Sequence, residues 1–335
     1  MTIHNERSRP TDRRPPPAAP RYARPPRRRR AVLAAVLAAG VAAATATTSA
    51  PAGATRQAAA TGVPIGVHVV QKASAFDHQF LFKSARATCG DGEVVVGGGA
   101  QVFPDNSFTR QVALRSLVPI KNADGQGHDS YSVTAVAVDG VQVDWKVTAF
   151  AVCARAGSVP THHIVPKVTG LAEGKTTDAT AAVCPSGERV LGTGAEVVGV
   201  AGSGDLVLQV ARPDGPGGIA RVQGHVGVEA FTGPWRVGAY AICAATPLGY
   251  KVAFGRSDEA ASESRKDAFA LCPGQQPLGF GGAVTNVAPA NASLQSIEPF
   301  ANSSGKGSKT LATENTPTTD PWDFIVTTAV CVNNG

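Results

Sequence analysis

The chain contains three copies of one cysteine-bearing phrase, and this repeat constrains the fold more than any other feature of its 335 residues. The copies read "CGDGEVVVGGGA" from Cys89, "CPSGERVLGTGA" from Cys184 and "CPGQQPLGFGGA" from Cys272. Self-similarity of this kind indicates one structural unit that is used several times. In each copy nine residues separate the cysteine from a Gly-Ala pair, which is Gly99-Ala100, Gly194-Ala195 or Gly282-Ala283.

Two further phrases recur in the same order. The first reads "VALRSLVP", "LVLQVARP" and "ASLQSIEP", and the second reads "WKVTAFAVCA", "WRVGAYAICA" and "WDFIVTTAVCV". Each closing phrase runs from a tryptophan to a cysteine: Trp145 to Cys153, Trp235 to Cys243 and Trp322 to Cys331. The third contains one extra residue, which predicts a β-bulge between Trp322 and Cys331. We expect homologous units over residues 71–157, 158–246 and 247–335.

The units have the pattern of β structure. In the first closing phrase, Trp145, Cys153 and the small apolar residues between them alternate with Lys146, Thr148 and Phe150, as in a strand. Further strands of unit 1 are expected over Phe80–Cys89, Glu93–Val102, Gln111–Val118 and Tyr131–Val138. No segment shows a sustained helical period. The sequence therefore predicts an all-β protein of three units, arranged either as tandem β-sandwiches or as one pseudo-threefold assembly resembling a β-prism.

The first 54 residues differ from the rest of the chain. They contain ten arginines and two acidic residues, an uncharged stretch from Ala31 to Ala44, and a small-residue site at Ala52-Gly53-Ala54. This order is typical of a cleaved secretory signal peptide, exported by the general or the twin-arginine route. Residues 55–70 are expected to form a flexible leader.

Removal of residues 1–54 changes the charge of the chain. The whole chain has 31 basic and 25 acidic residues; subtracting ten and two leaves 21 and 23, a net charge of −2. We therefore expect no nucleic acid partner and no stable membrane insertion after cleavage.

Six cysteines in an exported chain are expected to form disulfides. Two pairings treat the three units alike. The favoured one lies within units and joins Cys89 to Cys153, Cys184 to Cys243 and Cys272 to Cys331. The shifted one joins Cys153 to Cys184, Cys243 to Cys272 and Cys89 to Cys331.

The candidate motifs for phosphate binding and metal binding have simpler interpretations, and no motif typical of catalysis is found. Gly192-Thr193-Gly194 lies in a strand-like run that recurs in every unit, so it is interpreted as scaffold and not as a phosphate loop. His162-His163 is interpreted as an exposed linker between units, because no ligand spacing typical of zinc accompanies it. We assign no catalytic, cofactor-binding or metal-binding residue and expect no cofactor.

Aromatic residues are the weak candidates for ligand contact. Each unit has one tryptophan, and sugars stack on indole rings, although packing beside the disulfide is the favoured role. Two rings on the opposite strand face are equally plausible platforms. The candidates are Trp145, Trp235, Trp322, Phe150 and Tyr240.

The phrase set resembles uncharacterised secreted actinobacterial-type proteins with repeated C-P-x-G…GGGA…W…CA modules. The resemblance covers residues 71–335 and departs from the pattern at Gly90, which replaces proline, and at Val332, which replaces alanine. It implies secretion and a repeated architecture, and it brings no assigned chemistry.

Together these features lead us to expect a secreted, extracellular or cell-wall-associated protein that is not an enzyme. The favoured function is binding of a cell-wall polysaccharide or another glycan through repeated loops. One alternative is a structural or protein-interaction module, such as a coat component or an inhibitor, with another extracellular protein as partner. The other is a secreted hydrolase with an unrecognised site.

Overall fold

The computed structural model describes residues 64–104, 112–122, 128–137, 143–199, 206–227, 231–258, 264–285, 292–314 and 324–334. The segment interpreted as a signal peptide, residues 1–54, and Trp322 lie outside the described residues. Within them, no helix is long and apolar enough to cross a membrane.

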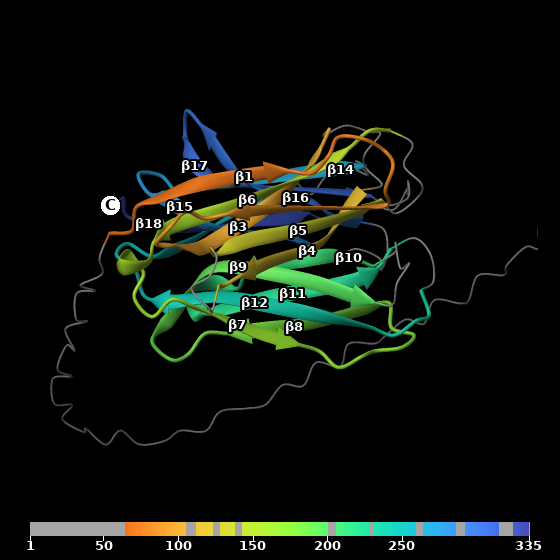
Figure 1. The fold of residues 1–335 in the computed structure, drawn as a ribbon, viewed down its shortest axis with the longest axis horizontal. Helices are drawn as coiled ribbons and strands as arrows, with labels where there is room; N and C mark the ends of the chain where they lie inside the picture. The colour runs from red at the N-terminus through yellow and green to blue at the C-terminus, as the bar shows by residue number, and fades with distance from the viewer. Residues whose placement is uncertain are drawn as a thin grey trace, which may run out of the picture. The chain divides into compact units, whose positions relative to one another are not determined.

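Each unit contributes six strands (Figure 1). Unit 1 has β1 (Val67–Ala73), β2 (Phe82–Thr88), β3 (Glu93–Phe103), β4 (Val112–Ile120), β5 (Ser130–Ala137) and β6 (Lys146–Arg155). Unit 2 has β7 (His163–Val168), β8 (Thr177–Val183), β9 (Glu188–Gly199), β10 (Leu206–Pro213), β11 (Ile219–Val226) and β12 (Trp235–Ala245). Unit 3 has β13 (Lys251–Arg256), β14 (Arg265–Leu271), β15 (Gln276–Val284), β16 (Ala292–Asn302), β17 (Gly305–Glu314) and β18 (Ile325–Val332). Two 3-10 turns, Ala156–Ser158 and Gly215–Gly217, complete the described elements.

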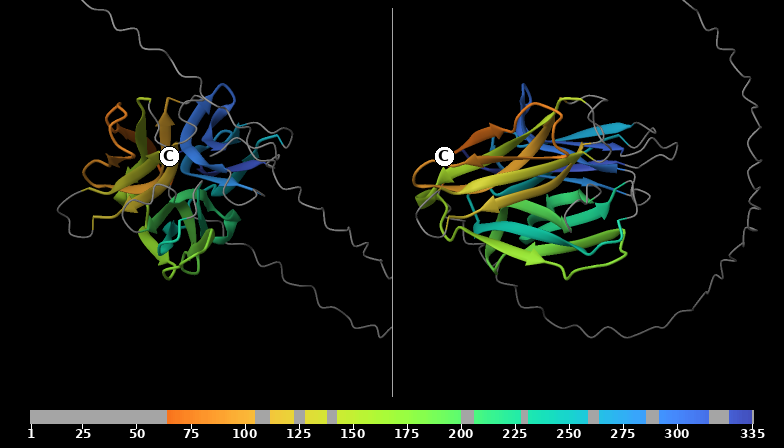
Figure 2. Two further views of the ribbon diagram at one scale, coloured as in Figure 1. Left: turned by 90° about the vertical axis from the view of Figure 1, so that its right-hand side faces the viewer. Right: turned by 45° about the vertical axis from the view of Figure 1, so that its right-hand side comes forward.

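The sheets are shared between units. Each of the three antiparallel sheets has six strands, in the orders β1-β6-β3-β16-β17-β14, β2-β5-β4-β9-β12-β7 and β13-β18-β15-β10-β11-β8. The first, third and sixth strands of a unit join one sheet, and its second, fourth and fifth strands join the next. The three units therefore form one closed pseudo-threefold assembly of the β-prism kind, and not tandem sandwiches. The left panel of Figure 2 shows the units as orange, green and blue lobes around a common centre.

Within a unit, the two three-stranded layers pack face to face, and one disulfide joins them. Cys89 directly follows β2 in one sheet, whereas Cys153 lies in β6 of another. The pairing is within units throughout, as favoured from the sequence: Cys89–Cys153, Cys184–Cys243 and Cys272–Cys331. Each bridge closes a loop of about 60 residues and stabilises its unit by roughly 4 kcal/mol in the chain-entropy model.

The expected strands of unit 1 match β2 to β6 closely, but the first strand of this unit was not predicted. β1 begins at Val67, within the stretch 55–70 that was expected to be a flexible leader. Edge strand β2 alternates exposed and buried residues, the pattern of a strand with one face in a core. Strands β3, β6 and β12 are buried on both faces, which explains their runs of small and apolar residues.

A bulge in the glycine-rich strand of each unit brings three backbones together at the pseudo-threefold axis. The ladder skips one buried residue, namely Val96 in β3, Leu191 in β9 and Leu278 in β15. The next residue is a glycine, and we call Gly97, Gly192 and Gly279 the axis glycines. A Cβ on Gly97 would lie 2.0 Å from the Leu278 carbonyl oxygen, and one on Gly279 would lie 2.1 Å from the Leu191 carbonyl oxygen. Only glycine allows this approach.

This bulge also corrects the alignment of the third repeat. At the seams between units, Ala100 pairs with Ile297, Ala195 with Leu117, and Gly282 with Ala211. Gly281-Gly282, and not Gly282-Ala283, is therefore the structural equivalent of Gly99-Ala100 and Gly194-Ala195. The β-bulge predicted between Trp322 and Cys331 is not seen in the described part of that segment, since β18 pairs continuously with β13 from Val326 to Cys331.

The axis packing predicts a strong position effect for added methyl groups. Gly97→Ala should lower the free energy of unfolding by at least ~2 kcal/mol, because its Cβ meets backbone that cannot move aside. Gly157→Ala is the matched control, since a Cβ there has no neighbour within 4 Å. Urea unfolding of both variants checks the difference. Equal stability would contradict the close approach at the axis.

One buried histidine predicts acid sensitivity. His225 in β11 is fully buried, and burial lowers its pKa to about 4. The unfolded chain binds this proton near pH 6.5 and the folded protein only near pH 4, so stability falls as the pH falls through this window. Between pH 6.5 and 5 the loss is about 2 kcal/mol. His225→Gln should remove that part of the pH dependence in urea titrations at the two pH values; an unchanged dependence would contradict it.

Candidate functional site

The two described tryptophans are core residues, and their position in the unit differs from the expectation. Trp145 and Trp235 are fully buried, so neither offers an indole face to a ligand. They also do not pack beside the disulfides, because eight residues of extended strand, about 26 Å, separate Trp145 from Cys153. Instead each backbone pairs with the connection between the first two strands of its unit, at Asp77 and Ala172 respectively. The Trp235 Nε1–H donates to the Lys175 carbonyl at 3.1 Å.

The two rings on the opposite strand face each belong to a residue that pairs with a glycine of the neighbouring glycine-rich strand. Phe150 pairs with Gly99 and is 8% exposed, so it is not a platform for a ligand. Tyr240 pairs with Gly194 and is partly exposed, but its hydroxyl donates to the Glu196 carboxylate at 2.6 Å. Burial and this hydrogen bond raise the Tyr240 pKa. Both rings act mainly in packing.

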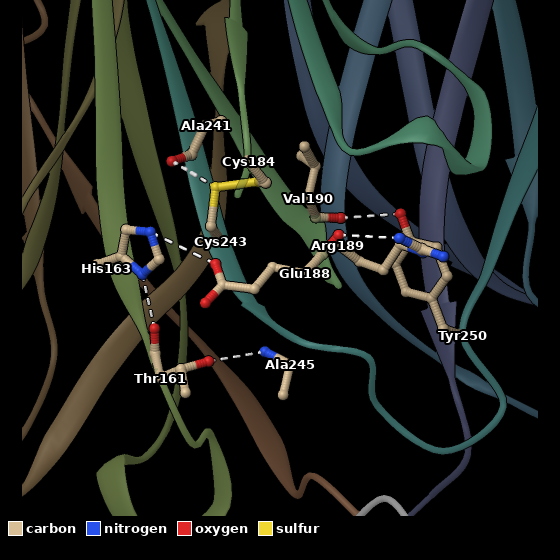
Figure 3. The surroundings of a disulfide bond; sticks show 10 residues. All are labelled: Thr161, His163, Cys184, Glu188, Arg189, Val190, Ala241, Cys243, Ala245 and Tyr250. Atoms are coloured by element: carbon tan, nitrogen blue, oxygen red, sulfur yellow. Dashed lines mark hydrogen bonds and ion pairs between the residues drawn. A yellow bond between two sulfur atoms is a disulfide. The ribbon is translucent and has the colours of Figure 1, made fainter. Parts of the chain in front are cut away.

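The disulfide end of units 1 and 2 gathers a histidine and a glutamate beside the second cysteine. His163 Nε2 lies 3.4 Å from Glu188 Oε2 next to Cys243 (Figure 3), and His68 Nε2 lies 3.5 Å from Glu93 Oε2 next to Cys153. The sulfur atoms are in disulfide bonds, which leaves two ligands in each cluster. A zinc site needs three or four ligands, so this geometry does not support one.

The histidine pair was interpreted as an exposed linker, and the structure corrects that interpretation. His163 lies in β7, whereas the His162 ring is partly buried at the seam with unit 1. His162 Nε2 lies 2.7 Å from the Val95 carbonyl oxygen, where it donates a hydrogen bond. Burial lowers the His162 pKa, which favours the neutral ring.

The strongest candidate for ligand contact is a set of exposed apolar residues at the other end of unit 1. The connection from β1 to β2 and its neighbours expose four phenylalanines and a leucine over 37–65% of their surface. We call these residues the aromatic surface: Phe76, Phe80, Leu81, Phe82 and Phe103. The phrase "SAFDHQFLF" carries the signal in the sequence, but its second half was expected to belong to the strand Phe80–Cys89.

Polar and charged groups border the aromatic surface. The rings of Phe76 and Phe103 are 6.1 Å apart, and the Lys146 ammonium lies 5.0 Å from the Phe103 ring centre. His78 Nδ1 lies 2.7 Å from Asp144 Oδ1 at the same end. Apolar ring faces therefore stand beside groups that can donate or accept hydrogen bonds.

Lys83 holds the connection between β1 and β2 in place. The residue is 5% exposed, and its ammonium donates to the carbonyls of Asp77 (2.5 Å) and Trp145 (2.6 Å) and to the Asp77 carboxylate (2.7 Å). The ammonium also lies 4.8 Å from the Trp145 ring centre. The hydrogen bond from Lys83 keeps the Asp77 pKa below its ordinary value. The connection is thus positioned by a buried cation before any ligand arrives.

The surface differs between units. Unit 2 exposes only Leu171 among the large apolar residues of its corresponding connection, and the described residues of that connection in unit 3, Ser257, Asp258 and Ser264, are polar. The exposed aromatic residues are therefore not repeated at the three equivalent connections among the described residues.

The hydrogen bonds of Lys83 predict that Lys83→Met lowers the free energy of unfolding by about 2 kcal/mol, because buried carbonyls then lose their donor. It should also expose residues 74–81 to limited proteolysis. Lys72→Met, which removes an exposed lysine from β1, is the control and should change neither property. Unchanged proteolysis of the Lys83 variant would show that Lys83 does not order the connection between β1 and β2.

Comparison of the sequence with protein-family models and with curated proteins finds no match. The resemblance to repeated secreted actinobacterial-type modules therefore stays a prediction. What the molecule establishes by itself is an all-β protein with three disulfides, which are typical of extracellular proteins.

Proposed function

We propose that this protein is a secreted, non-catalytic binding protein whose aromatic surface recognises a cell-wall polysaccharide or a related glycan. The observation that carries the proposal is the aromatic surface on unit 1, held by the buried Lys83. Secretion is supported by the arginine-rich, alanine-rich N-terminal segment and by the three disulfides.

The chemistry of the surface suits a sugar. A pyranose ring has an apolar face of C–H groups and an edge of hydroxyl groups. The exposed rings of Phe76 and Phe103 match the first, and the bordering Lys146 and Asp144 can exchange hydrogen bonds with the second. Rigid aromatic side chains also lose little conformational entropy on binding.

A rigid prism is also consistent with a binding role. The loops at this end stand on strands whose layers are joined by disulfides and whose seams are buried. Such a scaffold positions a surface without having to move. In this proposal the protein is not an enzyme, because its sequence carries no recognised catalytic motif.

The proposal predicts retention of the protein on an insoluble wall polymer. The chain without residues 1–54 should sediment with at least one of peptidoglycan, chitin and cellulose. The double variant Phe76→Ser/Phe80→Ser should bind at least tenfold more weakly, since burying one phenylalanine contributes roughly 1.5–3 kcal/mol. Phe254→Ser is the matched control, because Phe76 and Phe254 are each 53% exposed.

The outcomes separate the candidate functions. Binding that survives the double variant would overturn the role of the aromatic surface. No retention on any polymer, together with capture of an extracellular protein that the double variant loses, would favour the protein-interaction alternative. Turnover of a polymer that a single Asp, Glu, Ser or His substitution abolishes would favour a hydrolase.

A further inference from the structure

The three seams between units differ at one equivalent position, which lies just before the residue that pairs with the second cysteine. His68 pairs with Cys153, His163 with Cys243, and Lys251 with Cys331. The preceding residues are therefore structural equivalents: Val67 in unit 1, His162 in unit 2 and Tyr250 in unit 3.

At two seams this position inserts a ring with a hydrogen-bond donor against the preceding unit. The Tyr250 hydroxyl donates to the Val190 carbonyl at 3.0 Å (Figure 3), and His162 Nε2 lies 2.7 Å from the Val95 carbonyl. Both acceptors occupy the same place, directly before the bulge of their strand. Both rings are partly buried, and burial raises the Tyr250 pKa to about 12, so its hydroxyl stays protonated.

The third seam, between units 3 and 1, lacks this ring. Val67 has neither a ring nor a donor, and the equivalent acceptor residue is Pro277, which pairs with Cys331 before the bulge at Leu278. A cavity of about 420 Å³ lies here, within the size range of small-molecule sites. Its walls are mainly apolar and include Val67, Pro277, Pro299 and Phe300, with His68 and Lys306 among the polar lining residues.

We propose that this seam cavity binds a phenolic ring, whose hydroxyl donates to the Pro277 carbonyl as Tyr250 donates to Val190. The protein itself shows, at two equivalent seams, that a planar ring with one donor fits this environment. The ligand is either a free phenol or the tyrosine side chain of a polypeptide, which share the same recognised group. The site is separate from the aromatic surface, so it does not depend on the proposed function.

Titration of the chain without residues 1–54 with 4-methylphenol, followed by NMR, tests the proposal. We expect one saturable site with a dissociation constant of roughly 1 mM or below, as is usual for a ligand of so few atoms. 4-Methylanisole, which has the ring but no donor, should bind about tenfold more weakly. N-acetyltyrosine amide, compared with 4-methylphenol, distinguishes a polypeptide source from a free phenol by which of the two binds more tightly.

Two substitutions relate binding to the cavity. Val67→Tyr should place its own ring in the cavity, abolish binding and raise the melting temperature. Val67→Phe, which adds a ring but no hydroxyl donor, should also abolish binding. Lys72→Tyr, at an exposed position of the same strand, is the control and should bind as the unchanged protein does. Conversely, Tyr250→Val should open a second cavity at the seam between units 2 and 3 and create a second 4-methylphenol site.

The proposal is overturned if the unchanged chain shows no saturable binding of either phenol. It is also overturned if 4-methylanisole binds as well as 4-methylphenol, or if Val67→Phe binds unchanged. A failure of Val67→Tyr to fold leaves the Val67→Phe and Tyr250→Val measurements to decide.

Discussion

The close approach of three backbones at the axis glycines is the contact on which the rest of the structure depends. Because Gly97, Gly192 and Gly279 have no Cβ, strands β3, β9 and β15 can meet around the pseudo-threefold axis. That meeting brings the edge of each three-stranded layer into register with the layer of the next unit, and the seams then pair through two residues each. Without it the units would be small sandwiches with unpaired edges, which are prone to aggregation.

The near-symmetric skeleton carries sites that are not symmetric. The axis, the seams and the disulfides recur in all three units, because each copy must satisfy the same packing. The aromatic surface occurs on unit 1, and the seam cavity lies between units 3 and 1. Repetition thus supplies the scaffold, while a difference at a single equivalent position, such as Val67 in place of a ring, gives one seam a different lining.

The local features of the fold could be predicted from the sequence, and the features that depend on neighbouring units could not. Strands β2 to β6 follow from alternation, and the repeat reduces the disulfides to two pairings, of which the favoured within-unit one is observed. The sharing of sheets does not, because each seam pairs only two residues and leaves no pattern in either strand. Strand β1 was missed since its mixed residues lie on an exposed edge, where burial enforces no alternation.

The candidate site was predicted less well for a similar reason. A buried tryptophan and an exposed one look alike in a sequence, so the alternation alone does not assign Trp145 and Trp235 to the core. The role of Lys83 in ordering the β1–β2 connection requires the carbonyls of Asp77 and Trp145, which come together only in the folded chain.

Unit 3 shares a sheet with unit 1 without a covalent link between them, so the closed assembly fixes the cyclic order of the units but not which unit comes first along the chain. Residues 156–162 and 246–250 connect successive units, and the six residues Asn333 to Gly335 and Pro64 to Gly66 would form a link of similar length. The fold is therefore compatible with circular permutation, with new ends between any two units.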